Sequence, residues 1–321
     1  MKRIIAFFMT VSVFAVVMLG GCNSQNKNEK ISVVCTAFAQ YDWVKNILGE
    51  RVGDYELTLL SDSGTDMHNY QPSVEDMVKI GKSDLFIYVG GESDKWVPDV
   101  LKQVGGNDLR TINLIEALGD RAMTEEHDHE ESGDDHDHDH EEYADEHVWL
   151  SLKNAAVLCG KIADELKIID EGFAAAYAAN FEKYKEKLSA LDALYESAVS
   201  VAKYDTLVFG DRFPFKYLVR DYDLKYYAAF EGCSAENEAS FETIVSLARA
   251  VDEFNLPAVC KIEGSNNKIA ETVKNNTTSK NQLILSFNSM QSVTAASIKA
   301  GADYLSAMQD NLETLKKALG C

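Results

Sequence analysis

Histidine and carboxylate side chains are concentrated in one short segment, residues 127–140, which reads HDHEESGDDHDHDH. It holds five of the seven histidines of the chain, and seven of its other nine residues are carboxylates. Imidazole nitrogens bind zinc and related divalent metals, and neighbouring carboxylates raise the local cation concentration. So polar a segment predicts a loop, which could be merely solvated, but the strict alternation of Asp and His favours metal binding. We therefore interpret five residues as an accessory metal loop: His127, His129, His136, His138 and His140.

The other two histidines lie in predicted loops beside predicted helices. His68 is part of DMHNYQPSVED, between a strand pattern and a helix start, and His147 is part of DEHVWLS, directly after the acidic tract. Loops at strand ends are where α/β proteins bind ligands, so both imidazoles are candidate metal ligands. Carboxylates that could orient the two rings from behind are close in sequence: Asp66, Asp76, Asp145 and Glu146.

Short apolar runs alternate with helical patterns twice along the chain. The predicted strands are residues 31–38, 55–61, 84–90 and 110–114, and then 206–210, 225–230, 258–263 and 283–287. The predicted helices are residues 41–48, 73–80, 94–103, 214–220, 238–254, 266–275 and 303–319. Strand–helix alternation favours parallel strands, so the sequence predicts an α/β fold of two lobes with parallel sheets.

One long helical pattern, residues 170–202, separates the two lobes. Apolar and aromatic residues recur there at spacings of three and four, and no proline interrupts them. A helix of this length would span about 50 Å and act as a rigid link between the lobes. The alternative is two shorter helices broken near Ser189.

The N-terminal segment reads as a targeting signal. Two basic residues precede an apolar run at 4–19, and LGGC follows, which resembles a bacterial lipobox with Cys22 as the lipidated residue. An ordinary signal peptide with an incidental cysteine is the alternative. The expected organisation is a signal at 1–22, a tether at 23–30, an N-terminal metal-binding lobe at 31–165 with the acidic loop at 124–146, a linking helix at 166–202 and a C-terminal lobe at 203–321.

The net charge of −21 is unevenly distributed. Residues 122–146 carry 13 carboxylates and no Lys or Arg, which leaves −8 for the rest of the chain. A moderately acidic body argues against a nucleic-acid partner and suits a small cation. Cys35, Cys159 and Cys260 lie in apolar runs and are expected in the core.

Two motifs resemble those of the cluster A-I metal-binding lipoproteins, the substrate-binding subunits of bacterial ABC importers for zinc and manganese. GTDMHNYQPSVEDM is similar to that family's H-x-Y-x-P-[ST]-x-x-D motif, and DEHVWLSL is similar to its D-P-H-V-W-L-D-P motif. An acidic histidine loop before the second motif is a mark of the zinc-transporting members. The resemblance implies two α/β lobes joined by a rigid helix, with the metal in the cleft between them.

By this resemblance His68 and His147 take the places of the first two metal ligands. The third place falls on Arg212, which does not bind cations, so neighbouring Asp211 could substitute, and the fourth falls on Asn288. Two outcomes are left open. The metal site could be weaker or three-coordinate and completed by water, or Arg212 could pair with a carboxylate and bridge the lobes. Other possible contributors are Glu231, Cys233 and Glu263.

The resemblance implies a lipid-anchored, monomeric receptor on the extracellular face of the cell membrane, which is the periplasmic side if an outer membrane is present. It would capture Zn²⁺ and deliver it to an ABC permease driven by an ATPase subunit, without catalysing a reaction. Because imidazoles that bind a metal must be neutral, zinc affinity should fall below about pH 6.5.

Manganese is the alternative ligand, since oxygen ligands from Asp211 and Asn288 would suit a harder ion. A zinc hydrolase is disfavoured, because H-E-x-x-H and H-x-E with P-C-x-x-C are missing from the sequence.

Overall fold

The computed structural model describes residues 30–104, 106, 108–123, 144–231 and 239–321. Residues 31–321 form one compact unit, which is described below. The signal with Cys22, the tether apart from Lys30, the five histidines of the acidic loop and Cys233 lie outside the described residues.

The first half of this unit builds a four-stranded parallel sheet. Its strands are β1 (Ile31–Cys35), β2 (Tyr55–Leu59), β3 (Leu85–Tyr88) and β4 (Arg110–Asn113), arranged in the order β2-β1-β3-β4. The helices of this half are α1 (Phe38–Leu48), α2 (Val74–Lys82), α3 (Val97–Val104) and α4 (Leu114–Leu118). Strand–helix alternation in the sequence therefore gave the right sheet type.

The second half repeats this plan. Its strands are β5 (Thr206–Phe213), β6 (Lys225–Glu231), β7 (Ala258–Ile262) and β8 (Leu283–Phe287), in the order β6-β5-β7-β8 and again all parallel. Its helices are α7 (Lys216–Asp221), α8 (Phe241–Glu253), α9 (Lys268–Asn276), α10 (Ala295–Lys299) and α11 (Tyr304–Leu319). In both sheets the first two strands of the half occupy corresponding places.

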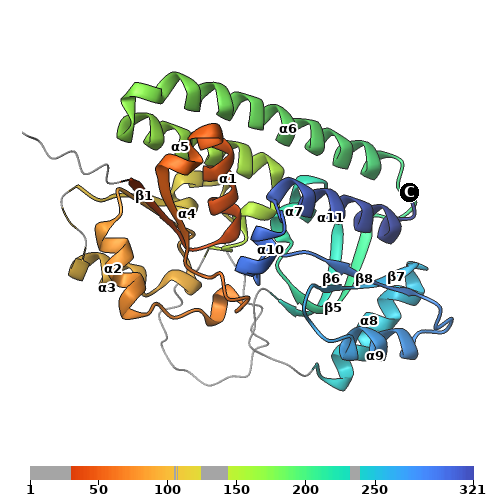
Figure 1. The fold of residues 1–321 in the computed structure, drawn as a ribbon. Coiled ribbons are helices and arrows are strands. Elements are labelled where there is room, and N and C mark those ends of the chain that lie inside the picture. The colour runs from red at the N-terminus through yellow and green to blue at the C-terminus, as the bar shows by residue number, and fades with distance from the viewer. Residues whose placement is uncertain (1–29, 105, 107, 124–143, 232–238) are drawn as a thin grey trace, which may run out of the picture. The chain divides into compact units, whose positions relative to one another are not determined.

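Two consecutive helices, α5 (Leu152–Ile169) and α6 (Ala174–Ser200), lie between the halves in sequence. They pack against each other, and α6 also contacts α1 and α11, one helix from each half. The helix α6 is continuous through Ser189, so the two-helix alternative is wrong, although its 27 residues give about 40 Å rather than 50 Å. Its buried stripe is Tyr177, Tyr184, Leu188, Leu191, Tyr195 and Ala198. In Figure 1, α6 runs along one side of the molecule past both sheets.

The main hydrophobic core crosses both halves. One cluster of buried residues joins the first sheet, α1, α5, α6, the second sheet and α11, and includes Cys35, Cys159 and Cys260 as predicted. Two smaller clusters lie under α2 and α3, and under α8 and α9, on the outer faces of the two sheets (Figure 1). A shared core makes relative movement of the halves costly, because separation would expose apolar surface.

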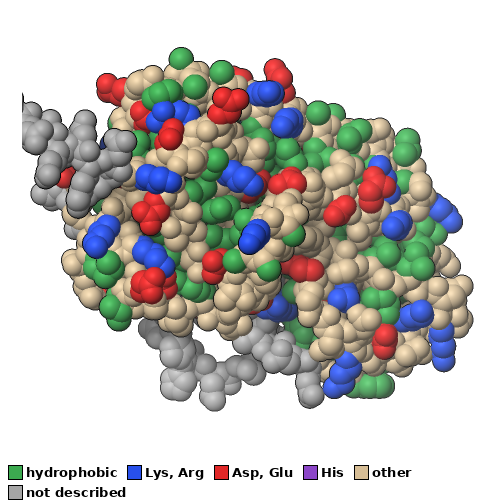
Figure 2. All heavy atoms as spheres, viewed as in Figure 1, with side chains coloured by type: hydrophobic (Ala, Val, Ile, Leu, Met, Phe, Trp, Pro, Cys, Tyr) green, Lys and Arg blue, Asp and Glu red, His purple; other side chains and the backbone are tan. Residues whose placement is uncertain are grey.

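In the view of Figure 2, acidic and basic side chains are interspersed over the described residues, and this face has no large patch of like-charged side chains. This distribution fits the modest charge that the sequence assigns to the body of the chain. Within the described residues, none of the helices combines the length and apolar character that crossing a bilayer requires.

Candidate metal centre

His68 is held at the carboxyl end of β2 by a short 3-10 turn, Met67–Asn69. The turn is capped by Asp66, whose carboxylate accepts a hydrogen bond from the backbone N–H of His68 at 3.1 Å. The following helix α2 begins at Ser73, which forms a capping box with Asp76. Local sequence signals therefore fix the backbone on both sides of this histidine.

His147 is fully buried and immediately precedes the 3-10 turn Val148–Leu150 that leads into α5. One oxygen of Asp145, Oδ1, accepts hydrogen bonds from both the backbone N–H of His147 at 2.8 Å and its ring Nδ1 at 3.0 Å. The ring also packs edge-on to Trp149, whose indole N–H donates to the backbone carbonyl of Ser289 in the second half. His147 is thus fixed by its own loop and by contacts between the halves.

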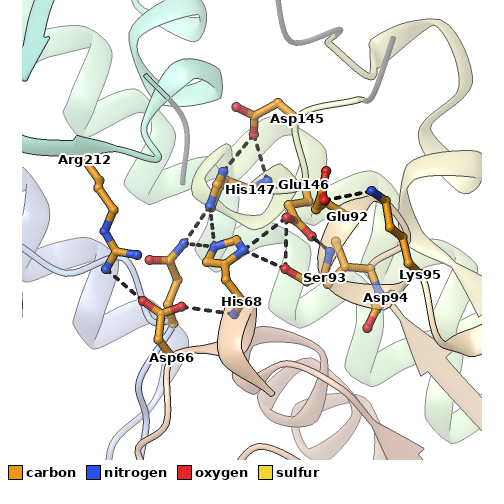
Figure 3. A network of polar contacts seen from close by, with 12 residues as sticks. Asp66, His68, Glu92, Ser93, Asp94, Lys95, Asp145, Glu146, His147 and Arg212 are labelled. Atoms are coloured by element: carbon orange, nitrogen blue, oxygen red, sulfur yellow. Dashed lines mark hydrogen bonds and ion pairs between the residues drawn. The ribbon is translucent and has the colours of Figure 1, made fainter. Parts of the chain in front are cut away.

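The two imidazoles meet. Their Nε2 atoms lie 3.3 Å apart and their ring centroids 5.4 Å apart, although the residues are 79 positions apart in sequence (Figure 3). A zinc–imidazole bond is about 2.0–2.1 Å long, so two Nε2 atoms this close can bind one ion after a small adjustment.

Buried carboxylates hold both rings in the tautomer that binds metals. Behind His68, Nδ1 lies 3.1 Å from Glu146 Oε1 and 2.6 Å from the hydroxyl of Ser93 (Figure 3). Behind His147, the carboxylate of Asp145 accepts a hydrogen bond from the ring Nδ1–H. With the proton on Nδ1, the lone pair of each ring is on Nε2, and the two lone pairs point to the same place. Burial alone would raise the pKa of Glu146 and of Asp145, but the adjacent histidines lower both pKa values below their ordinary range.

The orienting carboxylates differ from those expected in two respects. Glu146 comes from the loop of His147 but contacts the ring of His68, and Ser93 donates hydrogen bonds to the same carboxylate. Asp76 does not orient a ring, because it accepts hydrogen bonds from Ser73 and from Tyr70 at the start of α2. The contact of Glu146 with a ring in another loop depends on tertiary structure, so no pattern in the sequence predicts it.

The two residues expected as ligands from the second half have other contacts. Asp211 accepts hydrogen bonds from the backbone N–H groups of Arg212 and Ile262 and from the hydroxyl of Ser265. The amide oxygen of Asn288 accepts from the backbone N–H of Met290 at 2.9 Å. Within the described residues no group of three or more His, Cys, Asp or Glu side chains is placed to hold a metal. The structure therefore brings together His68 and His147 and does not add Asp211 to them.

Arg212 forms the carboxylate pair that the sequence left open as one outcome. Its guanidinium lies 2.8 Å from Asp66, and both side chains are largely shielded from solvent (Figure 3). Successive residues of a strand point to opposite faces, so when Asp211 faces Ile262, Arg212 faces the first half. Because Asp66 also caps the turn of His68, this pair links the second half to one of the two histidine loops.

The other two described candidates of the second half, Glu231 and Glu263, form contacts with residues of their own half. Glu231 is half exposed and contacts Lys216 at 3.5 Å and the hydroxyl of Tyr226. Glu263 accepts hydrogen bonds from the backbone N–H and hydroxyl of Ser289 at 2.6 and 2.7 Å, and burial raises its pKa.

Sequence reasoning missed Gln291, which contacts both histidines. Its amide nitrogen lies 2.8 Å from Nε2 of His68 and 2.6 Å from Nε2 of His147, and the residue is only 3% exposed. It follows β8 in the same loop as Asn288, and its backbone carbonyl accepts from the N–H of Met67. A lone glutamine has no motif; the one available signal was its place in the loop already expected to supply a ligand.

Comparison with known families and relatives shows which proteins this chain resembles. The family model described as ZnuA, zinc-uptake complex component A periplasmic, matches residues 33–318. The chain is 30% identical over 324 residues to the zinc-binding lipoprotein AdcA of Streptococcus pneumoniae, covering 99% of this chain and 61% of that protein. It is 28% identical over 323 residues to the high-affinity zinc uptake system protein ZnuA of Bacillus subtilis, covering 99% and 98%.

Solved structures share the fold. The crystal structure of the Zn(II)-bound ZnuA-like domain of Streptococcus pneumoniae AdcA superposes with a TM-score of 0.71 at 28% identity, over 91% of this chain and all of that one. The chain spans about three fifths of the length of the AdcA relatives that it matches. Since the family model covers nearly the whole of the described chain, the protein belongs to the family of zinc-uptake complex component A.

Proposed function

We propose that this chain is the substrate-binding protein of a zinc importer, which captures Zn²⁺ between His68 and His147 and releases it to a permease. The observation that carries the proposal is the 3.3 Å approach of two Nε2 atoms whose rings are backed by Asp145 and Glu146. Imidazoles oriented by carboxylates are the usual protein ligands of zinc. The relatives named as zinc-binding support the same ion.

Zinc is favoured over manganese by the contacts of the second half. Manganese would need hard oxygen ligands, and the expected ones were Asp211 and Asn288. The oxygens of both side chains accept hydrogen bonds from backbone N–H groups, which hold them within the second half. Two imidazoles without a neighbouring carboxylate ligand suit zinc better.

The proposal places the protein outside the cytoplasm. Cys22 would be the lipid attachment site and residues 23–30 the tether, so that a monomer delivers its ion to an ABC permease with its ATPase subunit. The acidic histidine loop, residues 124–146, would collect ions for delivery to the binding site or sense their abundance. The names of the relatives, a lipoprotein and an uptake-system protein, support this arrangement.

The test is zinc titration of the full chain and of His68→Ala, with affinity measured by competition with a chromogenic chelator. We expect the tightest zinc site to be lost in the variant, because one of two imidazoles is removed, while circular dichroism stays unchanged. Gln103→Ala, in an exposed position of α3, is the matched control and should bind as the unmodified chain does. Unchanged tight binding in His68→Ala would falsify the proposal.

A further inference from the structure

The hydroxyl of Tyr217, on α7 of the second half, joins two backbone groups of the first half. It accepts a hydrogen bond from the N–H of Met123 and donates one to the carbonyl oxygen of Asp145, each at 2.9 Å. A hydroxyl carries one hydrogen and accepts through its lone pairs, so both bonds form at once. The side chain is fully buried, so water does not compete for this hydroxyl.

The two backbone groups lie at the ends of the acidic histidine segment. The described chain stops at Met123 and resumes at Ala144, and residues 124–143 carry 11 carboxylates and no Lys or Arg. A segment of that composition has little apolar surface with which to hold its own ends together. The N–H of Asp145 donates to the carbonyl of Met123 at 2.7 Å, so the ends pair with each other as well as with Tyr217.

Arg220, one turn further along α7, supports the same closure. Its guanidinium donates to the carbonyl of Arg121 at 3.0 Å and lies 4.9 Å from the centre of the Tyr217 ring. A cation over an aromatic ring is attracted to the negative face of the ring, so Arg220 helps to hold the ring that carries the hydroxyl. Two side chains three positions apart on one helix face therefore contact both ends of the segment.

The contact with Asp145 reaches the candidate metal site in two steps. Oδ1 of Asp145 accepts hydrogen bonds from the backbone N–H of His147 at 2.8 Å and from its ring Nδ1 at 3.0 Å. The position of the Asp145 backbone therefore decides where this oxygen lies, and the oxygen sets the direction in which the Nε2 lone pair points. The Tyr217 hydroxyl fixes that backbone from the second half.

From these contacts we infer that Tyr217 positions His147 for metal capture. By closing the base of the acidic segment, its hydroxyl holds Asp145 where the carboxylate orients the ring. This inference rests on the proposed function and deepens it, because it names a second-half residue on which the geometry of the metal site depends. Tyr217 acts through Asp145 rather than on the ion, and its effect is to keep His147 arranged for binding before the ion arrives.

The test compares Tyr217→Phe with Tyr195→Phe in the full chain, with zinc affinity measured by chelator competition. Tyr195 is the matched control, because its buried hydroxyl also donates to a backbone carbonyl, that of Met308 at 2.6 Å, but between α6 and α11. Zinc affinity of Tyr217→Phe should fall roughly 3- to 10-fold, less than on loss of a direct partner of a metal-binding histidine. That of Tyr195→Phe should change less than about twofold, because the site is distant.

A second readout follows the ring of His147 itself. In proton NMR of the metal-free protein, its Nδ1–H should give a signal that is protected from exchange, because the proton is buried and hydrogen-bonded. Tyr217→Phe should weaken this protection, and Tyr195→Phe should leave it as in the unmodified chain. A residue that only stabilised the fold would change the signal alike in both variants.

Equal zinc affinity in Tyr217→Phe and Tyr195→Phe would overturn the inference, and so would equal protection of the ring proton. If Tyr217→Phe fails to fold, a crystal structure of the zinc-loaded unmodified chain decides. We expect the Tyr217 hydroxyl still to donate to the Asp145 carbonyl there, and a broken contact with His147 on the zinc would overturn the inference. Failure of the proposed function is distinct, since the unmodified chain would then lack a tight zinc site that depends on His68.

Discussion

The two halves of the molecule share a sheet order but differ in what their loops present to each other. The first half supplies two imidazoles with buried carboxylates behind them, Asp145 and Glu146. The second half uses its acidic side chains internally, Asp211 on backbone N–H groups and Glu263 on Ser289. Toward the histidines the second half presents the amide of Gln291, and toward Asp66 it presents the guanidinium of Arg212. A repeated fold thus positions loops in equivalent places without repeating their chemistry, and the comparison separates a half that binds from a half that completes and fixes the site.

The strongest way to break this comparison is to remove the charge behind His147. In Asp145→Asn the imidazole loses an anionic acceptor at Nδ1, which weakens Nε2 as a donor to metal, so zinc affinity should fall about 10- to 100-fold. Chelator competition measures the affinity, and Asp99→Asn, an exposed substitution on α3, is the control. Equal zinc affinity in Asp145→Asn and the unmodified chain would show that the first half does not dominate binding.

Removing the ion pair between Arg212 of the second half and Asp66 of the first should affect stability more than zinc binding. Arg212→Met leaves Asp66 without its partner in a partly shielded position, and we expect the free energy of unfolding to fall by about 1–3 kcal/mol, between the values for exposed and buried pairs. Urea unfolding of the metal-free protein measures this loss. Zinc affinity should change less than in Asp145→Asn. If Arg212→Met weakened zinc binding as strongly as Asp145→Asn, the division between the two halves would be wrong.

The effect expected to matter least for zinc binding is on stability, at the contact between α1 of the first half and α11 of the second. The carboxylate of Asp42 accepts a hydrogen bond from the backbone N–H of Tyr304, and burial raises the pKa of Asp42 to about 6. Because the folded state then binds a proton more tightly than the unfolded state, this group favours folding at low pH and loses that contribution as pH rises from about 4 to 6.

Asp42→Asn removes this titration while keeping an acceptor for Tyr304. The stability of the variant relative to the unmodified chain should therefore increase with pH across that interval, by up to about 1.4 kcal/mol per pH unit. Urea unfolding at several pH values measures the difference. A difference independent of pH would show that Asp42 titrates alike in both states.

The sheets and the histidine pair were predictable, because each depends on short-range patterns. Apolar runs bounded by loops located all eight strands, and β8 was placed at its observed ends. Helix starts were less accurate: α1 begins at Phe38, three residues before the predicted start, because its N-cap residue is Ala37, which is not one of the residue types that mark a helix start. Both histidines followed from their positions at strand and helix ends.

The second half of the site was not predictable from spacing. Counting positions placed the third ligand on Arg212, with its neighbour Asp211 as the substitute, but the pairing of β5 with β6 shifts register between Phe209 and Arg212. In a strand a shift of one residue exchanges the two faces, so which of two neighbours turns toward the first half is set by this irregularity. Gln291 and Glu146 act through contacts between distant loops, which single-sequence patterns do not encode. The lobe boundaries, which were drawn from the same patterns, stay a prediction.

The central claim is that one ion binds between two specific imidazole nitrogens, and anomalous diffraction tests it most directly. A crystal of the full chain loaded with one equivalent of zinc, measured above and below the zinc edge, locates the metal without assumptions about its ligands. We predict the strongest anomalous peak about 2.0–2.1 Å from Nε2 of both His68 and His147. A strongest peak that touches neither ring, with both Nε2 atoms still facing Gln291, would contradict the account.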